Sequence, residues 1–258
     1  MMEIFLQADT WGALITLTFL EIVLGIDNII FITIAANKLP EKLQKKATNI
    51  GLVLAMLLRI ALLFGISLLI AMNAPLFHVD FSWFKAGFTG QALILFAGGI
   101  FLLYKSTKEI HHKVEGLSEE ETDTKPQKGY TLSQAIIQIT LINIVFSFDS
   151  ILTAVGMTNG VEGAMIIMIA SVILSMVIMM LFANPVGKFV NKHPTIQMLG
   201  LSFLILIGFM LIAEGAHLSH ATLFGEEVGT VPKGYLYFAI TFSLVVEMLN
   251  MKMRGSKK

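Results

Sequence analysis

The 258-residue chain contains no cysteine, which excludes disulfide scaffolds, thiolate nucleophiles and soft thiolate metal sites. Charge is scarce as well, since only 14% of the residues are charged, and 18 Lys and Arg balance 18 Asp and Glu. A net charge of zero provides no basic field for nucleic acid, so we expect no nucleic-acid partner. Hydrophobic residues make up 55% of the chain and the mean hydropathy is +0.78, which is typical of an integral membrane protein.

Seven apolar stretches are long enough to cross a bilayer core, which takes roughly 20 helical residues. They cover residues 11–36, 49–72, 88–104, 132–157, 163–183, 195–213 and 234–251. All six prolines lie between these stretches or at their ends, where helices begin or stop. The predicted fold class is therefore all-α, a polytopic protein with a single membrane domain over 1–258 in contact with the lipid bilayer.

Lys and Arg are distributed unequally between the two sides of the membrane. Fifteen fall in the connections that follow odd-numbered spans, two on the opposite side, and Arg59 within the second span. Because cytoplasmic loops retain basic residues, we predict the N-terminus outside and the C-terminus in the cytoplasm. The stretch Met1–Thr10 has no basic residue and thus lacks the basic first segment of a cleavable signal peptide. We therefore expect the first span to remain in the mature protein. The connection 105–129 carries both signs of charge and is predicted to be a cytoplasmic linker.

The first and fourth spans carry a similar motif. The segments TFLEIVLGIDNIIFIT (18–33) and TLINIVFSFDSILTAV (140–155) align without a gap and match at five of 16 positions. One match pairs Asp27 with Asp149, and an acid in the middle of a span is rare. The other matches are Thr18/Thr140, Ile22/Ile144, Val23/Val145 and Ile29/Ile151.

These motifs indicate an internal repeat. The copies would be 11–104 and 130–213, with three spans each, and 234–251 would be an additional helix. The third and sixth spans resemble each other weakly, through Gly99/Gly208 and Leu102/Leu211. Three spans per copy would place the two copies upside down relative to each other, as in many secondary transporters, whose binding sites lie where the repeats meet.

Ionisable residues within the spans are the candidate functional groups. On a straight helix Glu21 and Asp27 lie about 9 Å apart along the axis and some 120° around it. Gripping one ion therefore requires an opening at Gly25 or a partner helix. The ionisable candidates are Glu21, Asp27, Asp149, Glu214, Glu247 and Arg59.

An antiparallel arrangement of the first and fourth spans would bring Asp27 and Asp149 together near a pseudo-twofold axis. Glu21 and Asn143 would flank them, and Asn28, Ser147 and Ser150 would add neutral oxygens. Oxygen ligands suit Mn²⁺, Mg²⁺ or Ca²⁺ better than Cu⁺.

Two further charged groups leave alternatives open. Arg59 could neutralise a carboxylate when no cation is bound, or could only stabilise the bundle. Glu247 could be a further ligand, a proton acceptor or an interhelical hydrogen-bond partner.

Histidines occur at the ends of two spans. Glu214, His217 and His220 are spaced by three residues, which on a continuous helix would place them near one face as possible metal ligands. An exposed helix end accepts the same residues without any ligand role. The pair His111-His112 is expected at the surface.

Four segments resemble the TerC (tellurium-resistance C) family of bacterial integral membrane proteins: LEIVLGIDNIIFI (20–32), NIVFSFDSILTAVG (143–156), GGIFLLYKSTKEIH (98–111) and PKGYLYFAITFSLVVEMLN (232–250). The resemblance implies a multi-pass inner-membrane protein tied to metal-ion homeostasis, with members that export manganese. It also implies that the metal path is formed by Glu21, Asp27, Asn28, Asp149 and Ser150. Family members often carry aspartate at the position of Asn143. With an amide there, the site has one negative charge fewer.

The sequence thus predicts an inner-membrane carrier for Mn²⁺ or a similar hard divalent cation, with no enzymatic activity and no resident cofactor. Two alternatives come from other classes. The first is a non-transporting scaffold in a metal or tellurite stress response, which would recruit partners through 105–129. The second is an intramembrane aspartyl protease using Asp27 and Asp149, although its Tyr-Asp and Gly-x-Gly-Asp marks are absent.

Overall fold

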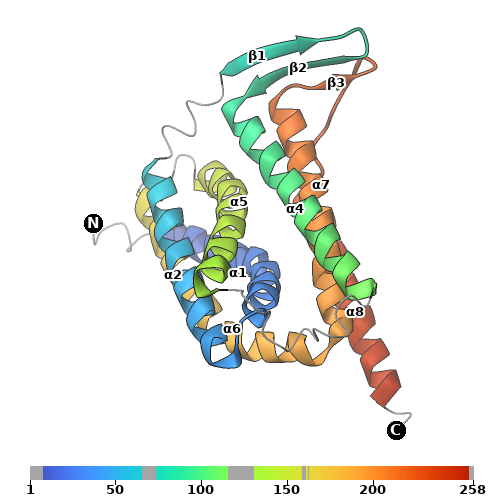
Figure 1. The fold of residues 1–258 in the computed structure, drawn as a ribbon. Helices are drawn as coiled ribbons and strands as arrows, with labels where there is room; N and C mark the ends of the chain where they lie inside the picture. Colours follow the sequence, from blue (N-terminus) through green and yellow to red (C-terminus); the bar gives the residue numbers. More distant parts are fainter. Residues whose placement is uncertain (1–7, 66–73, 116–130, 159–160, 162, 256–258) are drawn as a thin grey trace. The chain divides into compact units, whose positions relative to one another are not determined.

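The computed structural model describes residues 8–65, 74–115, 131–158, 161 and 163–255, without the side chains of residues 8, 9, 23, 24, 26–28 and 149. Seven helices of 23 to 30 residues dominate the described part of the chain (Figure 1). They are α1 (Ala8–Asn37), α2 (Glu41–Phe64), α4 (Gly90–Val114), α5 (Leu132–Thr158), α6 (Ala164–Lys192), α7 (Pro194–Leu218) and α8 (Lys233–Gly255).

Each predicted span overlaps one of these helices, and residues 66–72 of the second predicted span lie outside the described residues. Among the described residues, the six helices α2, α4, α5, α6, α7 and α8 are long and apolar enough to cross a membrane, and Thr10–Ile22 within α1 is a shorter apolar helix. All of α1 has 30 residues, and a helix of that length rises about 45 Å against a bilayer core of roughly 30 Å. The prediction of an all-α polytopic membrane protein is confirmed.

Several helix ends differ from the prediction. Helix α2 begins at Glu41 rather than at residue 49, and α4 continues to Val114, so residues 105–114 of the predicted linker are helical. Ion pairs one turn apart, such as Lys105 with Glu109 at 3.1 Å, support this extension beyond the apolar stretch. Hydropathy locates the part of a helix that lies in lipid, and the helix itself can be longer. Glu115 follows α4 directly, and residues 116–129 of the predicted linker lie outside the described residues.

The expectation that every proline lies between the spans or at their ends, where helices begin or stop, is wrong for Pro185, which is inside α6. Proline fixes φ near its helical value and removes only one backbone donor, so a long helix can continue past it. Pro194 follows the expected pattern, because it occupies the first turn of α7.

The first of two compact units comprises residues 1–70 and 117–189 and contains α1, α2, α5 and most of α6. Within it α5 packs against both α2 and α1 (Figure 1). Gly51 of α2 contacts Ile139 of α5, and Arg59, farther along α2, bonds to Ser150, farther along α5. The two helices therefore run in the same direction, as the second and fourth spans of an alternating topology must.

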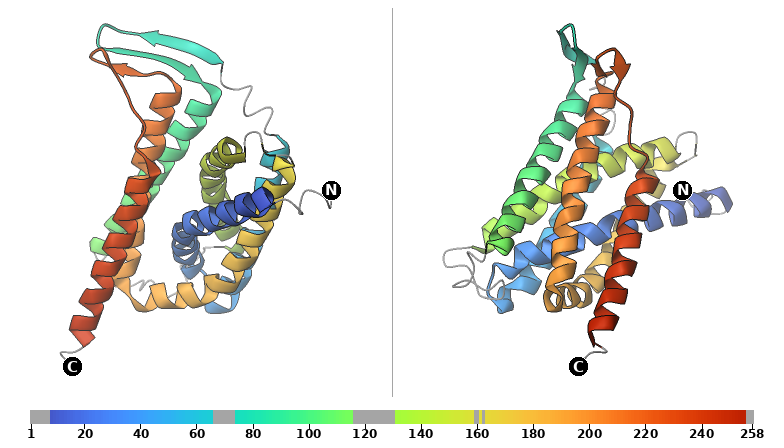
Figure 2. Two further views of the ribbon diagram at one scale, coloured as in Figure 1. Left: turned by 180° about the vertical axis from the view of Figure 1, so that it is seen from behind. Right: turned by 90° about the vertical axis from the view of Figure 1, so that its right-hand side faces the viewer.

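The second unit comprises residues 71–116 and 190–258, with α4, α7, α8 and a small sheet. Figure 2 shows α4 and α7 side by side along their length and α8 beside α7. Glycines set the spacing between α4 and α7, because a Cβ on Gly215 would lie 3.1 Å from the carbonyl oxygen of Ala92 and one on Gly99 would lie 2.7 Å from that of Gly208. The order of these contacts makes α4 and α7 antiparallel.

A four-stranded antiparallel sheet joins one end of α4 to the same end of α7. Thr89, the last residue of β2 (Phe84–Thr89), caps α4 by accepting a hydrogen bond from the Ala92 backbone N–H at 3.1 Å. The Gly87 backbone N–H donates to the carbonyl oxygen of Ser219, just after α7, at 2.8 Å. The strands are β1 (Pro75–Asp80), β2 (Phe84–Thr89), β3 (Thr222–Leu223) and β4 (Glu226–Glu227). The sequence prediction contained no strands, and this sheet is an addition to it.

The helix pairs α1–α5 and α4–α7 are the pairs that the sequence alignment matched as first with fourth span and third with sixth. Each pair packs within a single unit. The assignment of 11–104 and 130–213 as inverted repeats stays a prediction.

Candidate metal-ion site

Glu21 of α1 is a buried carboxylate, 4% exposed, within an apolar helix. A charge at such a position requires partners, because an unpaired buried ion is strongly unfavourable. One partner is Ser175 of α6, whose hydroxyl donates to Glu21 Oε2 at 2.6 Å. Sequence reasoning did not single out Ser175, although Ser171 and Ser175 form a one-turn pair of polar residues in an otherwise apolar run.

Arg59 of α2 is the counter-charge of Glu21. Its Nη1 lies 3.5 Å from Glu21 Oε2, and the arginine itself is 5% exposed. Its Nη2 donates to the hydroxyl of Ser150 on α5. The guanidinium therefore connects three helices, and Ser175 adds α6 as the fourth. The predicted pairing of Arg59 with an intramembrane carboxylate is present, with Glu21 as the acid.

The motif of α5, residues 140–155, contains further buried polar side chains besides Ser150. Asn143 is buried, and its amide nitrogen donates to the Ile139 carbonyl oxygen at 2.9 Å, which leaves the amide oxygen as its ligating end. Ser147 is also buried, and its carbonyl oxygen accepts from the Ser150 hydroxyl at 3.0 Å. Local side-chain bonds of this kind satisfy polar groups within an apolar helix.

The side chains of Asp27, Asn28 and Asp149 lie outside the described residues, so their predicted meeting is not tested. Their backbones belong to the uninterrupted helices α1 and α5. Ser150 follows Asp149 directly and bonds to the arginine that pairs with Glu21. The motif segments of α1 and α5 therefore reach the same guanidinium.

Gly25 does not open α1, which is helical from Ala8 to Asn37. A Cβ at this position would collide with the side chain of Met179 on α6. Gly25 lies one turn after Glu21, and Met179 one turn after Ser175, so α1 and α6 run in the same direction here. Of the two ways considered for completing an ion site, a helix break at Gly25 is wrong, and the partner helix stays a prediction.

Glu247 belongs to the second unit, on α8. Its Oε2 accepts a hydrogen bond from Asn250 at 3.5 Å, and the side chain of Thr195 also hydrogen-bonds to it. It borders a cavity of about 400 Å³ between α7 and α8 that Ser202 and Ser243 also line. Because Thr195 belongs to α7, this contact supports the predicted role of Glu247 as an interhelical hydrogen-bond partner.

The histidines at the end of α7 do not form the metal site considered from their spacing. The helix ends at Leu218, and His220 has φ of 46°, so the three residues do not share a helical face. The described residues contain no group of three or more His, Asp or Glu arranged to hold a metal. His217 instead faces the Val228 carbonyl oxygen at 3.3 Å. His111, expected at the surface, is exposed and pairs with Glu115 at 3.1 Å.

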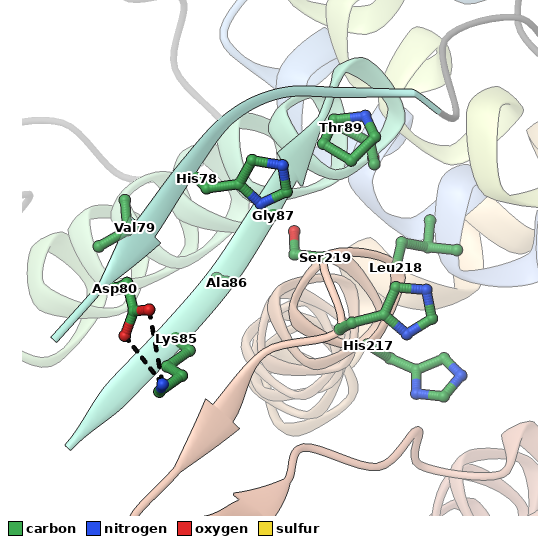
Figure 3. Close-up of a pocket in the computed structure, with 12 residues that line it drawn as sticks. His78, Val79, Asp80, Lys85, Ala86, Gly87, Thr89, His217, Leu218 and Ser219 are labelled. Carbon is green, nitrogen blue, oxygen red and sulfur yellow. Dashed lines mark hydrogen bonds and ion pairs between the residues drawn. The ribbon is translucent and has the colours of Figure 1, made fainter. Parts of the chain in front are cut away.

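A cavity of about 680 Å³ lies beside these histidines, between the end of α7 and the sheet. Figure 3 shows His78 of β1 and His217 on different sides of it, with Ser219 between them. Asp80 and Lys85 at its edge are paired with each other at 3.1 Å.

Helices of membrane-spanning length that enclose a buried carboxylate and guanidinium define a polytopic integral membrane protein with a polar site inside its spans. The chain belongs to the integral membrane protein TerC family, whose family model matches residues 6–258.

Named relatives support this membership. The inner membrane protein YgdQ of Escherichia coli is 44% identical over 243 residues, 94% of this chain and 93% of its own length. A UPF0053 protein of Haemophilus influenzae is 42% identical over the whole of both chains. The inner membrane protein YoaE of E. coli is 44% identical over 251 residues, and the match spans 44% of its length. No solved structure matches the chain. An inner-membrane location agrees with the names of the two E. coli relatives, and the orientation of the termini stays a prediction.

Proposed function

We propose that the protein carries a hard divalent cation, with Mn²⁺ as the substrate, from the cytoplasm to the outside by alternating access. The observation that carries this proposal is the convergence of α1 and α5 on Arg59. Glu21 lies at ion-pair distance from the guanidinium, and Ser150, the neighbour of Asp149, is hydrogen-bonded to it. Ionisable groups inside spans are costly and mark ion pathways in membrane proteins.

The donor set supports a hard cation. The groups around Arg59 are a carboxylate and hydroxyls, with the Asn143 amide farther along α5. No thiolate can contribute, since the chain has no cysteine. Oxygen donors prefer Mn²⁺, Mg²⁺ and Ca²⁺ over soft ions such as Cu⁺.

Arg59 neutralises Glu21 when no cation is bound. A divalent cation held by Asp27 and Asp149 would compete with Arg59 for Glu21, and its departure would let the arginine return. With the cation bound, its two charges would balance Asp27 and Asp149. In the empty site Arg59 balances Glu21 alone, so Asp27 and Asp149 would have to be protonated for a neutral occluded state on the return step.

Manganese uptake into everted membrane vesicles tests the proposal, because export from the cell becomes uptake in that geometry. Vesicles with the protein should accumulate Mn²⁺, and Asp27→Asn or Asp149→Asn should abolish the accumulation. Asp80→Asn is the matched control, since Asp80 is an exposed carboxylate of β1 outside the spans. Unchanged uptake in both aspartate variants would remove the proposal.

The aspartate variants, together with a linker deletion, separate the two alternative functions. A scaffold requires the linker and not the aspartates, so deletion of 117–129 would abolish its function and Asp27→Asn would not. A protease would cleave a model membrane substrate, and either aspartate substitution would end the cleavage.

A further inference from the structure

Two threonine hydroxyls in the first unit are buried without a hydrogen-bond partner among the described residues. They are the Oγ1 atoms of Thr18 on α1, 6% exposed, and of Thr140 on α5, 9% exposed. Two other buried threonines of the same helices bond to their own backbone: Thr33 donates to the Ile29 carbonyl oxygen and Thr158 to that of Ala154, each at 2.8 Å.

These two hydroxyls occupy matched positions. Thr18 and Thr140 are identical residues at the first aligned position of the two motifs, three residues before Glu21 and Asn143 respectively. Residues three apart lie about one turn apart on the same helix face. Each unpaired hydroxyl therefore shares a face with a buried side chain that carries a ligating oxygen.

A buried unpaired hydroxyl is a cost to the fold, because it has lost its water without gaining a partner. Valine has nearly the same shape and would avoid this cost. Threonine at both matched positions, with no partner among the described residues, therefore points to a bound ligand as the partner. A hydroxyl oxygen is a suitable ligand for a hard cation that has shed part of its water shell.

We infer that Thr18 and Thr140 are further cation-contacting residues, one from each half of the pathway on either side of Asp27 and Asp149. Each threonine precedes its aspartate by nine residues, which is about 13 Å along a helix. With the predicted orientation, Thr18 with Glu21 serves the outer half and Thr140 with Asn143 serves the cytoplasmic half. This inference rests on the proposed function.

The pathway would then be symmetric in its hydroxyls and asymmetric in its charge. The outer half combines a hydroxyl with a carboxylate, and the cytoplasmic half combines one with a neutral amide. A cation would enter through the neutral half and meet the acidic half before release to the outside.

Isosteric substitution tests the inference. Thr18→Val and Thr140→Val remove only the hydroxyl, and Thr33→Val and Thr158→Val are matched controls on the same helices. The Mn²⁺ concentration for half-maximal uptake into everted vesicles should rise about tenfold in the first pair, as expected for the loss of about one oxygen contact, and less than twofold in the controls. Thr18→Ser and Thr140→Ser should restore uptake. Thermal unfolding of the purified variants supplies a second measurement, and the first pair should be at least as stable as the wild type.

The outcomes are distinguishable when Asp27→Asn is measured alongside. If Asp27→Asn abolishes uptake while Thr18→Val and Thr140→Val match their controls, this inference is overturned and the proposed function stands. If Asp27→Asn and Asp149→Asn leave uptake unchanged, both are overturned. Reduced uptake together with reduced stability in the threonine variants would mean that the hydroxyls are structural, which also overturns the inference.

Discussion

Gly99 of α4 and Gly208 of α7 approach each other reciprocally. A Cβ added to Gly99 would lie 2.7 Å from the Gly208 carbonyl oxygen, and one added to Gly208 would lie 3.0 Å from the Gly99 carbonyl oxygen. The sequence alignment matches the same two residues as equivalent positions of the third and sixth spans. Equivalent positions that contact each other are what a twofold relationship between two helices produces.

The first prediction concerns this contact. Gly99→Ala should destabilise the α4–α7 pair by about 1–3 kcal/mol, because the obstructing atom belongs to the backbone and cannot rotate away. Thermal unfolding of the purified protein in detergent measures the effect. Gly12→Ala is the control, since a Cβ there meets no atom within 4 Å. Equal stability of the two variants would contradict the close approach.

The second prediction concerns the buried ion pair. Glu21→Gln should cost about 3–5 kcal/mol of stability, because it leaves the Arg59 guanidinium buried without its counter-charge. Adding Arg59→Met to Glu21→Gln should recover most of that loss, since no uncompensated charge remains. A double-mutant cycle on the unfolding free energy measures the coupling between the two residues.

The double-mutant cycle can also contradict the ion pair between Glu21 and Arg59. Additive effects of Glu21→Gln and Arg59→Met would mean that the two side chains do not interact. The recovered double variant should still fail to transport Mn²⁺, because Glu21 belongs to the proposed path.

The third prediction separates two serines on one helix. Ser175→Ala should lower stability by about 1.5–3 kcal/mol, because its hydroxyl donates to a charged acceptor, Glu21. Ser171→Ala should cost only about 0.5–1.5 kcal/mol, because that hydroxyl donates to the Met168 carbonyl oxygen within α6. Denaturant unfolding of both variants provides the comparison, and equal losses would argue against the contact with Glu21.

The fourth prediction concerns the histidines beside the sheet. His217→Ala and His220→Ala should leave Mn²⁺ binding to the purified protein unchanged, because the described residues around them form no group that could hold a metal. Isothermal titration with Mn²⁺ measures this directly. A clear loss of binding in either variant would show that the spacing argument was correct after all.

Hydropathy was sufficient to predict the helices, because a span must be apolar over its whole lipid-facing length whatever its neighbours are. The helix ends were harder to predict from hydropathy. In α4, residues 105–114 remain helical through charged pairs that hydropathy does not detect. Strands β3 and β4 could not be predicted, because each has only two residues. The turn between β3 and β4 uses Phe224 at φ of 52° next to Gly225 at 91°, and the phenylalanine gives no turn signal.

For the site, the sequence identified the charged residues and missed their neutral partner. Glu21 and Arg59 stood out because ionisable residues are rare in spans, and the structure brings them together. Ser175 carries no such signal, since serine occurs in membrane helices for packing alone. Which of many neutral residues faces a carboxylate depends on helix rotation, and an apolar helix such as α6 does not reveal its rotation through its sequence.

The hairpin that joins β1 to β2 offers an experimental handle on orientation. Its tip, Phe81 to Trp83, is exposed at the end of α4 away from the 105–114 extension. Because the chain has no native thiol, a cysteine introduced at Ser82 would be the sole target for a maleimide reagent that cannot permeate lipid. Labelling of intact spheroplasts would place the tip in the periplasm, and labelling restricted to lysed cells would reverse the assignment of every span.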